Sequence, residues 1–150
     1  MRALRAMVVE LEGLDRFVAA QAPIWPQALA EIRAGRKESH WMWFIWPQLR
    51  GLGLSAMAQT YGIAGRDEGL AYRAHPLLGP RLVEISRVML AHRAKPAAEV
   101  LGPVDAQKLR SSMTLFEALA PQDRIFADIL RAFFDGTRCD KTLALLTRPR

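Results

Sequence analysis

The stretch that decides the fold is His40-Trp41-Met42-Trp43-Phe44-Ile45-Trp46-Pro47-Gln48, which holds three of the chain's four tryptophans. Read as a helix or as a strand, this segment is apolar on every side, so it must be surrounded by protein. Pro47 prevents a long helix, because its ring removes a backbone donor and disfavours helical backbone at the preceding residue. We expect a short helical turn or an extended piece at the centre of the core. Because each indole also carries a hydrogen-bond donor, the segment is either central to the core, or one wall of a pocket, or both.

The composition is that of one globular domain. The 150 residues are 51% hydrophobic and 24% charged, which is enough to bury a core without disulfides or metals. We expect residues 1–12 to form an N-terminal extension and residues 13–150 to form a single all-helical domain. The first residues lack a small-residue cleavage site, and no apolar run approaches the roughly 20 residues that cross a bilayer. Neither a signal peptide nor a membrane partner is expected.

Cys139 is the single cysteine of the chain. It has no partner for an internal disulfide, and no Cys/His cluster surrounds it, so a structural zinc site is not expected. A reducing, cytoplasmic location fits best. The sequence contains no Gly-rich phosphate loop, no Gly-x-Ser-x-Gly elbow and no His-Glu-x-x-His motif, so no cofactor is indicated. Whether the protein is an enzyme stays open.

Apolar residues at helical spacing, interrupted by proline and glycine, predict helices along most of the chain. The expected helices cover residues 15–21, 23–34, 56–61, 67–74, 79–92, 97–101, 105–120, 126–135 and 140–146. The clearest apolar stripe is formed by Leu78, Leu82, Ile85 and Met89. No hairpin-like alternation of period two occurs. The predicted fold class is all-α, with irregular multihelical packing instead of a regular bundle.

His40 and Gln48 are the polar residues at the two ends of the aromatic segment. A backbone carbonyl could satisfy a partly buried His40, or the imidazole could contact a ligand or act as a general base, since its usual pKa near 6.5 suits proton transfer. Gln48 could hydrogen-bond across a buried turn or to a ligand. Both alternatives stay open for both residues.

Three polar residues interrupt the apolar face of the predicted helix 105–120. Asp105, Lys108 and Ser112 are spaced i, i+3 and i+7, so they share one face. Asp105 and Lys108 could simply pair with each other, or the face could line a cavity whose ligand or water satisfies the polar groups. We expect Arg110 to project to another, solvated face, as does Glu117 on the same helix.

A further candidate site lies at the predicted start of helix 79–92. His75 and Arg81 flank this start, where free backbone N–H groups attract anions, so together they could hold a phosphate or a carboxylate. The alternative is a surface turn. Ser111 and Ser112 could act as nucleophiles only if His40 or His75 came within hydrogen-bond reach.

The net charge of +6 raises the question of a nucleic-acid partner. The basic residues are scattered among acids, and the densest groups are Arg33, Arg36 and Lys37, then Arg148 and Arg150. Most scattered charges only solvate a surface. A nucleic-acid partner is therefore disfavoured but stays open.

Many short motifs along the chain resemble those of one family. They are Phe17-Val18-Ala19-Ala20-Gln21, Gly35-Arg36-Lys37-Glu38-Ser39 with the aromatic segment, Gly51-Leu52-Gly53, Tyr72 with His75-Pro76, Leu78-Gly79 with Arg81-Leu82, Lys108-Leu109-Arg110-Ser111-Ser112-Met113-Thr114-Leu115-Phe116, and Phe134-Asp135-Gly136 with Thr142-Leu143. In this order they resemble the bacterial domain of unknown function 1810 family, some members of which are labelled calpastatin-like. The resemblance implies a compact all-helical fold with distantly armadillo-like packing, and no assigned activity. Calpain inhibitors are long and disordered, so that label finds no support in this short, core-forming chain.

The leading hypothesis for function is a pocket for a small anionic ligand, walled by Trp41 and Trp43. Its polar contacts would come from His40, Gln48, Lys108, Ser111 and Ser112. One alternative is an interaction module that binds protein or nucleic acid through its basic surface, and another is a purely structural polar cluster. If His40, Lys108 and Ser112 converge on a cavity that solvent can reach, the pocket is favoured. The oligomeric state is not predicted.

Overall fold

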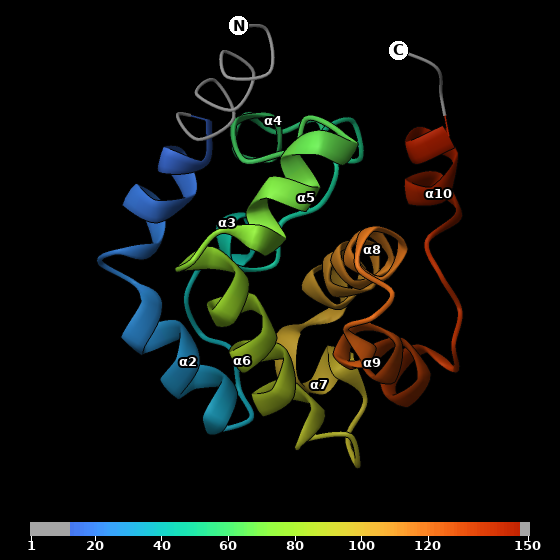
Figure 1. Cartoon of the computed structure of the whole chain (residues 1–150). Coiled ribbons are helices and arrows are strands. Elements are labelled where there is room, and N and C mark those ends of the chain that lie inside the picture. The colour runs from blue at the N-terminus through green and yellow to red at the C-terminus, as the bar shows by residue number, and fades with distance from the viewer. Residues whose placement is uncertain (1–12, 148–150) are drawn as a thin grey trace, which may run out of the picture.

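A computed structural model describes residues 13–147, so the predicted extension at residues 1–12 lies outside the described part (Figure 1). After a helical stretch at residues 13–21, the helices are α2 (Trp25–Arg33), α3 (Met42–Ile45), α4 (Ala56–Thr60), α5 (Arg66–Ala74), α6 (Leu78–Leu90), α7 (Ala97–Leu101), α8 (Pro103–Leu119), α9 (Arg124–Phe134) and α10 (Asp140–Thr147). Within residues 13–147 the one strand-like pairing is an isolated bridge between Leu49 and Ile63. The predicted all-α class is confirmed. No helix in this range is both long and apolar enough to span a membrane.

The observed helix ends follow the sequence closely, because proline and glycine set most of them. Gly102 lies between α7 and α8 and has a φ of 87°, a backbone conformation that favours glycine. Pro103 then occupies the first position of α8, where a missing N–H is tolerated. α8 therefore begins two residues earlier than predicted. The first helix, predicted to begin at residue 15, is already helical at Gly13.

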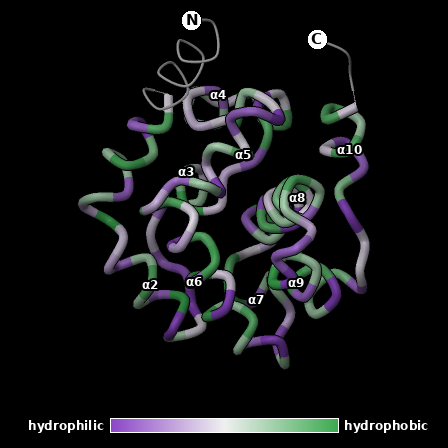
Figure 2. Tube along the Cα trace, in the orientation of Figure 1, coloured by the Kyte–Doolittle hydropathy of each residue, from purple (hydrophilic) through white to green (hydrophobic). Residues whose placement is uncertain are grey.

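α8 is the central helix of the packing (Figure 1). It contacts α5, α7, α9 and α10, while α6 packs against α2, α5 and α9. Residues 111–116 of α8 are all buried, so the middle of this helix is enclosed on every side. Figure 2 shows that hydrophilic and hydrophobic residues alternate along this helix. Polar side chains of α8 must therefore find partners inside the protein.

The aromatic segment lies in the core, as predicted, and forms the short helix α3. Trp41 and Trp46 are 0% and 1% exposed, and their ring centroids are 5.9 Å apart. The Trp46 indole N–H donates to Ser86 Oγ over 3.0 Å, and that of Trp41 donates to Glu31 Oε1 over 2.9 Å. Trp43, by contrast, is half-buried. Two of the three indoles therefore use their polar edges on the protein itself.

Candidate functional site

Glu31 explains why Trp41 is held inside the core. Its carboxylate accepts hydrogen bonds from the backbone N–H groups of Glu38 (2.8 Å) and Ser39 (2.9 Å), from Ser39 Oγ (2.7 Å) and from the Trp41 indole. Burial alone would raise the pKa of Glu31, but the hydrogen bonds from Ser39, Glu38 and Trp41 together lower it to about 2. With its ring buried and its N–H occupied, Trp41 cannot wall a ligand pocket, and that expectation must be corrected.

The residues expected to meet at a pocket are separated. His40 is exposed, so neither the partly buried histidine nor the general base facing a pocket is found. Ser112 is 0% exposed and faces the core, and its Oγ has no hydrogen-bond partner within residues 13–147. Lys108 alone of the three lines a cavity. The expected convergence of His40, Lys108 and Ser112 does not occur, because α8 is enclosed on the side that carries Ser112.

His75 and Arg81 do not form an anion site together. His75 Nδ1 accepts the backbone N–H groups of Leu77 (3.1 Å) and Leu78 (3.2 Å), so the start of α6 is capped by this side chain. Arg81 stacks on Trp25 at 5.1 Å from its guanidinium carbon to the ring centroid. It also donates to the buried Gln21 over 3.3 Å. The expectation that both bind an anion must be corrected, since these groups are committed to protein partners.

Asp105 has a partner that the helical spacing did not reveal. Its carboxylate lies 2.9 Å from Lys37 Nζ and 3.6 Å from Lys108 Nζ, so the i, i+3 pair is the weaker of two ion pairs. The side chain of Lys37 is 6% exposed. Of the basic group Arg33, Arg36 and Lys37, only the two arginines therefore lie at the surface, because Lys37 points inward to Asp105 of α8.

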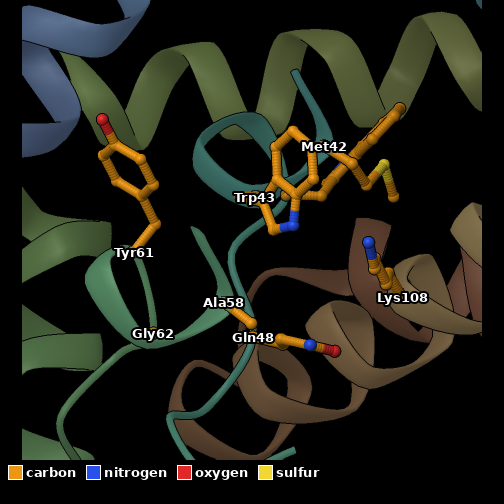
Figure 3. Close-up of a pocket in the computed structure, with 8 residues that line it drawn as sticks. Met42, Trp43, Gln48, Ala58, Tyr61, Gly62 and Lys108 are labelled. Atoms are coloured by element: carbon orange, nitrogen blue, oxygen red, sulfur yellow. The ribbon is translucent and has the colours of Figure 1, made fainter. Parts of the chain in front are cut away.

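A small pocket lies where Trp43, Gln48 and Lys108 meet, as Figure 3 shows. The Lys108 ammonium lies 4.9 Å from the centroid of the Trp43 ring, a cation–π distance. The volume of about 10 Å³ holds a single water at most. Any larger ligand must lie in an adjoining space.

That adjoining space is a cavity of about 500 Å³, open to solvent, between α8, the segment that leads into α10, and the loop after Gln48. We call it the α8–α10 cavity. Gln48 and Lys108 line both spaces, so the small pocket adjoins the larger cavity. Ser111 also lines it, and Leu52 and Val104 contribute apolar surface. Of the predicted site residues, the structure therefore brings Gln48, Lys108 and Ser111 together.

The α8–α10 cavity is strongly basic. Its charged lining residues are Lys108, Arg110, Arg138, Lys141 and Asp140, that is, four cations and one carboxylate. Arg138 is compensated by Glu117, which binds its Nε at 2.5 Å and its second terminal nitrogen at 2.7 Å. Arg110 and Lys141 have no acidic partner among residues 13–147, and the Arg110 Nε is buried without a hydrogen bond. Lys108 is paired with Asp105, so Arg110 and Lys141 are the cations of the lining that lack an acidic partner in the described part of the chain.

Arg110 and Glu117 were expected on a solvated face, and this expectation is wrong. α10 and the segment before it cover that side of α8, so Arg110 is half-buried and Glu117 binds Arg138. The contact joins residues more than 20 positions apart, which helical spacing cannot reveal. The sequence carried no clear signal of this arrangement, since Lys108 and Arg110 are two residues apart and do not share a helix face.

Cys139 also lines the cavity, and the sequence analysis did not select it. Its backbone N–H donates to Thr114 Oγ1 over 3.0 Å, which fixes the start of α10 on α8. Ser111 Oγ lies 3.4 Å from its sulfur. Burial would raise the pKa of the thiol, but hydrogen bonds from Ser111, from the side chain and backbone of Thr142 and from the backbone of Lys141 lower it overall. The position of the cysteine just before a predicted helix could have indicated a lowered thiol pKa, because the N–H groups at a helix start stabilise negative charge.

Comparisons with known proteins agree with the resemblance seen in the sequence. The family model described as protein of unknown function (DUF1810) matches residues 11–146. The crystal structure of the conserved hypothetical protein Rv1873 from Mycobacterium tuberculosis is similar, with 45% sequence identity and a TM-score of 0.89, over 91% of this chain and 97% of that one. No curated protein matches the chain. This chain belongs to the DUF1810 family of proteins of unknown function.

Proposed function

We propose that this protein binds a small anionic ligand in the α8–α10 cavity. The observation that carries the proposal is the uncompensated charge, since two of the four cations that line a space of about 500 Å³, Arg110 and Lys141, have no acidic partner among residues 13–147. Cations held close together repel one another, and a bound anion removes that cost. The volume lies within the usual range for small-molecule sites. The charge and the size of the cavity favour the same class of ligand.

The lining side chains suggest how the ligand is held. Arg110 offers a planar fork that fits a carboxylate or a phosphate, while Lys108 and Lys141 act as point charges. Gln48 and Ser111 supply neutral hydrogen-bonding groups next to them. The apolar surface of Leu52 and Val104 suits a ligand with a non-polar part besides its acidic group. Trp43 lines the small pocket that adjoins this cavity.

The test is calorimetric titration with pyrophosphate and citrate at low ionic strength, using a matched pair of charge-reversal variants. Lys141→Glu changes a lining residue, whereas Arg131→Glu makes the same change in charge on α9, where the side chain is 78% exposed and outside the cavity lining. We expect Lys141→Glu to weaken binding by about tenfold or more and Arg131→Glu by less than about twofold. Equal weakening would show that net charge alone attracts the anions. Absence of binding at millimolar concentration would refute the proposal directly.

A further inference from the structure

The α8–α10 cavity contains the one thiol of this chain. Cys139 is half-buried and lies where α10 begins, with Arg138 before it and Asp140 and Lys141 after it in sequence. The N–H groups at the start of a helix stabilise negative charge, as do nearby cations. These features surround the sulfur with groups that favour the thiolate, which is the nucleophilic form of cysteine.

Ser111 is placed to serve both forms of this sulfur. Its Oγ lies 3.4 Å from Cys139 Sγ and 3.2 Å from the backbone carbonyl oxygen of Gln107. A hydroxyl has one hydrogen to donate. When the sulfur is protonated, S–H donates to Oγ and the hydroxyl donates to Gln107; when it is a thiolate, the hydroxyl turns to the sulfur. Removal of the proton therefore exchanges one hydrogen bond for another at little cost.

One buried polar atom of the cavity lining, Arg110 Nε, lacks a hydrogen-bond partner among residues 13–147. Buried polar groups without partners are rare in native proteins, and a bound polar ligand would account for this one. The atom is evidence, independent of the sulfur, that the cavity containing the thiol accepts a polar group.

We propose that Cys139 undergoes thiol–disulfide exchange with an anionic low-molecular-weight disulfide that the cations of the α8–α10 cavity hold beside it. This inference rests on the anion binding proposed above. The Cys139 thiolate attacks one sulfur of the disulfide, a new S–S bond forms, and the old S–S bond breaks with its electron pair going to the departing thiolate. That thiolate leaves and takes a proton from water. Since the chain has no second cysteine, a free thiol of the same class must release the adduct by the reverse exchange.

The experiment compares three disulfide probes on the intact protein. They are 5,5′-dithiobis(2-nitrobenzoate), which carries two carboxylates, the neutral 2-hydroxyethyl disulfide, and cystamine, which carries two ammonium groups. Each exchange rate is divided by that of N-acetylcysteinamide with the same probe, which removes the intrinsic reactivity of the reagent, and intact mass confirms one adduct. We expect the normalised rate of the anionic probe to exceed that of the neutral one by about tenfold. The cationic probe should react more slowly than the neutral one.

Variants separate the parts of this inference. Lys141→Glu should remove the preference for the anionic probe, while Arg131→Glu should keep it. Ser111→Ala should raise the midpoint of the rate–pH profile without changing the order of the three probes, because it removes a donor to the thiolate and no charge. Cys139→Ser should form no adduct. Far-ultraviolet circular dichroism confirms that each variant is folded.

The outcomes distinguish this inference from the proposed function. If pyrophosphate binds as expected but Cys139 exchanges no faster than the model thiol, the inference is overturned and the proposed function stands. If pyrophosphate does not bind and the three normalised rates are equal, both are overturned. If Lys141→Glu still prefers the anionic probe, the cations of this cavity do not bind the disulfide, and the inference is overturned.

Discussion

Replacement of Glu31 by glutamine should destabilise the protein at neutral pH and much less in acid. The carboxylate accepts several hydrogen bonds, including the Trp41 indole at 2.9 Å and two backbone N–H groups that fix the turn before the aromatic segment. Glutamine keeps the shape and one acceptor oxygen but removes the charge. The hydrogen bonds to a charged acceptor are the stronger ones. The variant therefore tests whether charge, beyond shape, holds this turn in place.

The magnitude follows from the pKa. A shift from the ordinary 4.5 to about 2 corresponds to roughly 3 kcal/mol of preference for the charged form. Solvent near this surface turn screens part of the effect, so we expect Glu31→Gln to lower the free energy of unfolding by about 2 kcal/mol at pH 7. Since the pKa of Glu31 is lower in the folded state, this stabilisation is present above pH 4.5 and is lost as the pH falls from 4.5 toward 2.

The assay is urea unfolding followed by tryptophan fluorescence at pH 7 and at pH 3. Roughly half of the difference between wild type and Glu31→Gln should be gone at pH 3. The control is Glu84→Gln, because Glu84 is exposed and its ion pair with Arg33 spans 3.8 Å. This substitution should lower the free energy of unfolding by less than about 0.5 kcal/mol. A difference for Glu31→Gln that is the same at both pH values would refute the argument from charge.

Substitutions at three further positions test the packing of the helices, each by thermal or urea unfolding. Gly79→Ala should cost more than about 3 kcal/mol, because the added Cβ would lie 2.1 Å from the Arg73 carbonyl oxygen, which belongs to the backbone; a stable variant would contradict this close approach. His75→Ala should cost about 1 kcal/mol, since two N–H groups at the start of α6 lose their acceptor, and His75→Asn should recover part of that loss. Ser112→Ala should change stability by less than about 1 kcal/mol in either direction, because the buried hydroxyl has no partner to lose, and a larger loss would indicate a bound water or ligand.

Most of the fold could be predicted because the helix signals are local. Apolar spacing along residues 78–89 and the glycine and proline residues between segments placed each helix within one or two residues of its observed position. The burial of the aromatic segment followed from its composition, since a stretch that is apolar on all sides has no solvated face. The armadillo-like packing implied by the resemblance stays a prediction.

The candidate site could be predicted only in part, because its residues come from distant segments. Gln48, Lys108 and Ser111 were selected as polar groups in unusual settings, and they do line the cavity. Arg110 and Cys139 were missed, since a helical wheel shows which residues share a face but not which other segment covers it. His40 was selected because it adjoins the tryptophans in sequence, and neighbours in sequence do not always face the same side.

The sequence by itself determined the all-helical class, the family and the burial of the tryptophan segment, because periodicity, composition and short motifs act over a few residues. Only the tertiary structure decided how the polar groups are used. In the tertiary structure the Trp41 N–H donates to Glu31, Lys37 pairs with Asp105, and α10 packs on α8 so that Cys139 and Lys141 line one cavity with Lys108. Electrostatic and hydrogen-bond partners are chosen by distance in space, and the packing of the helices sets that distance.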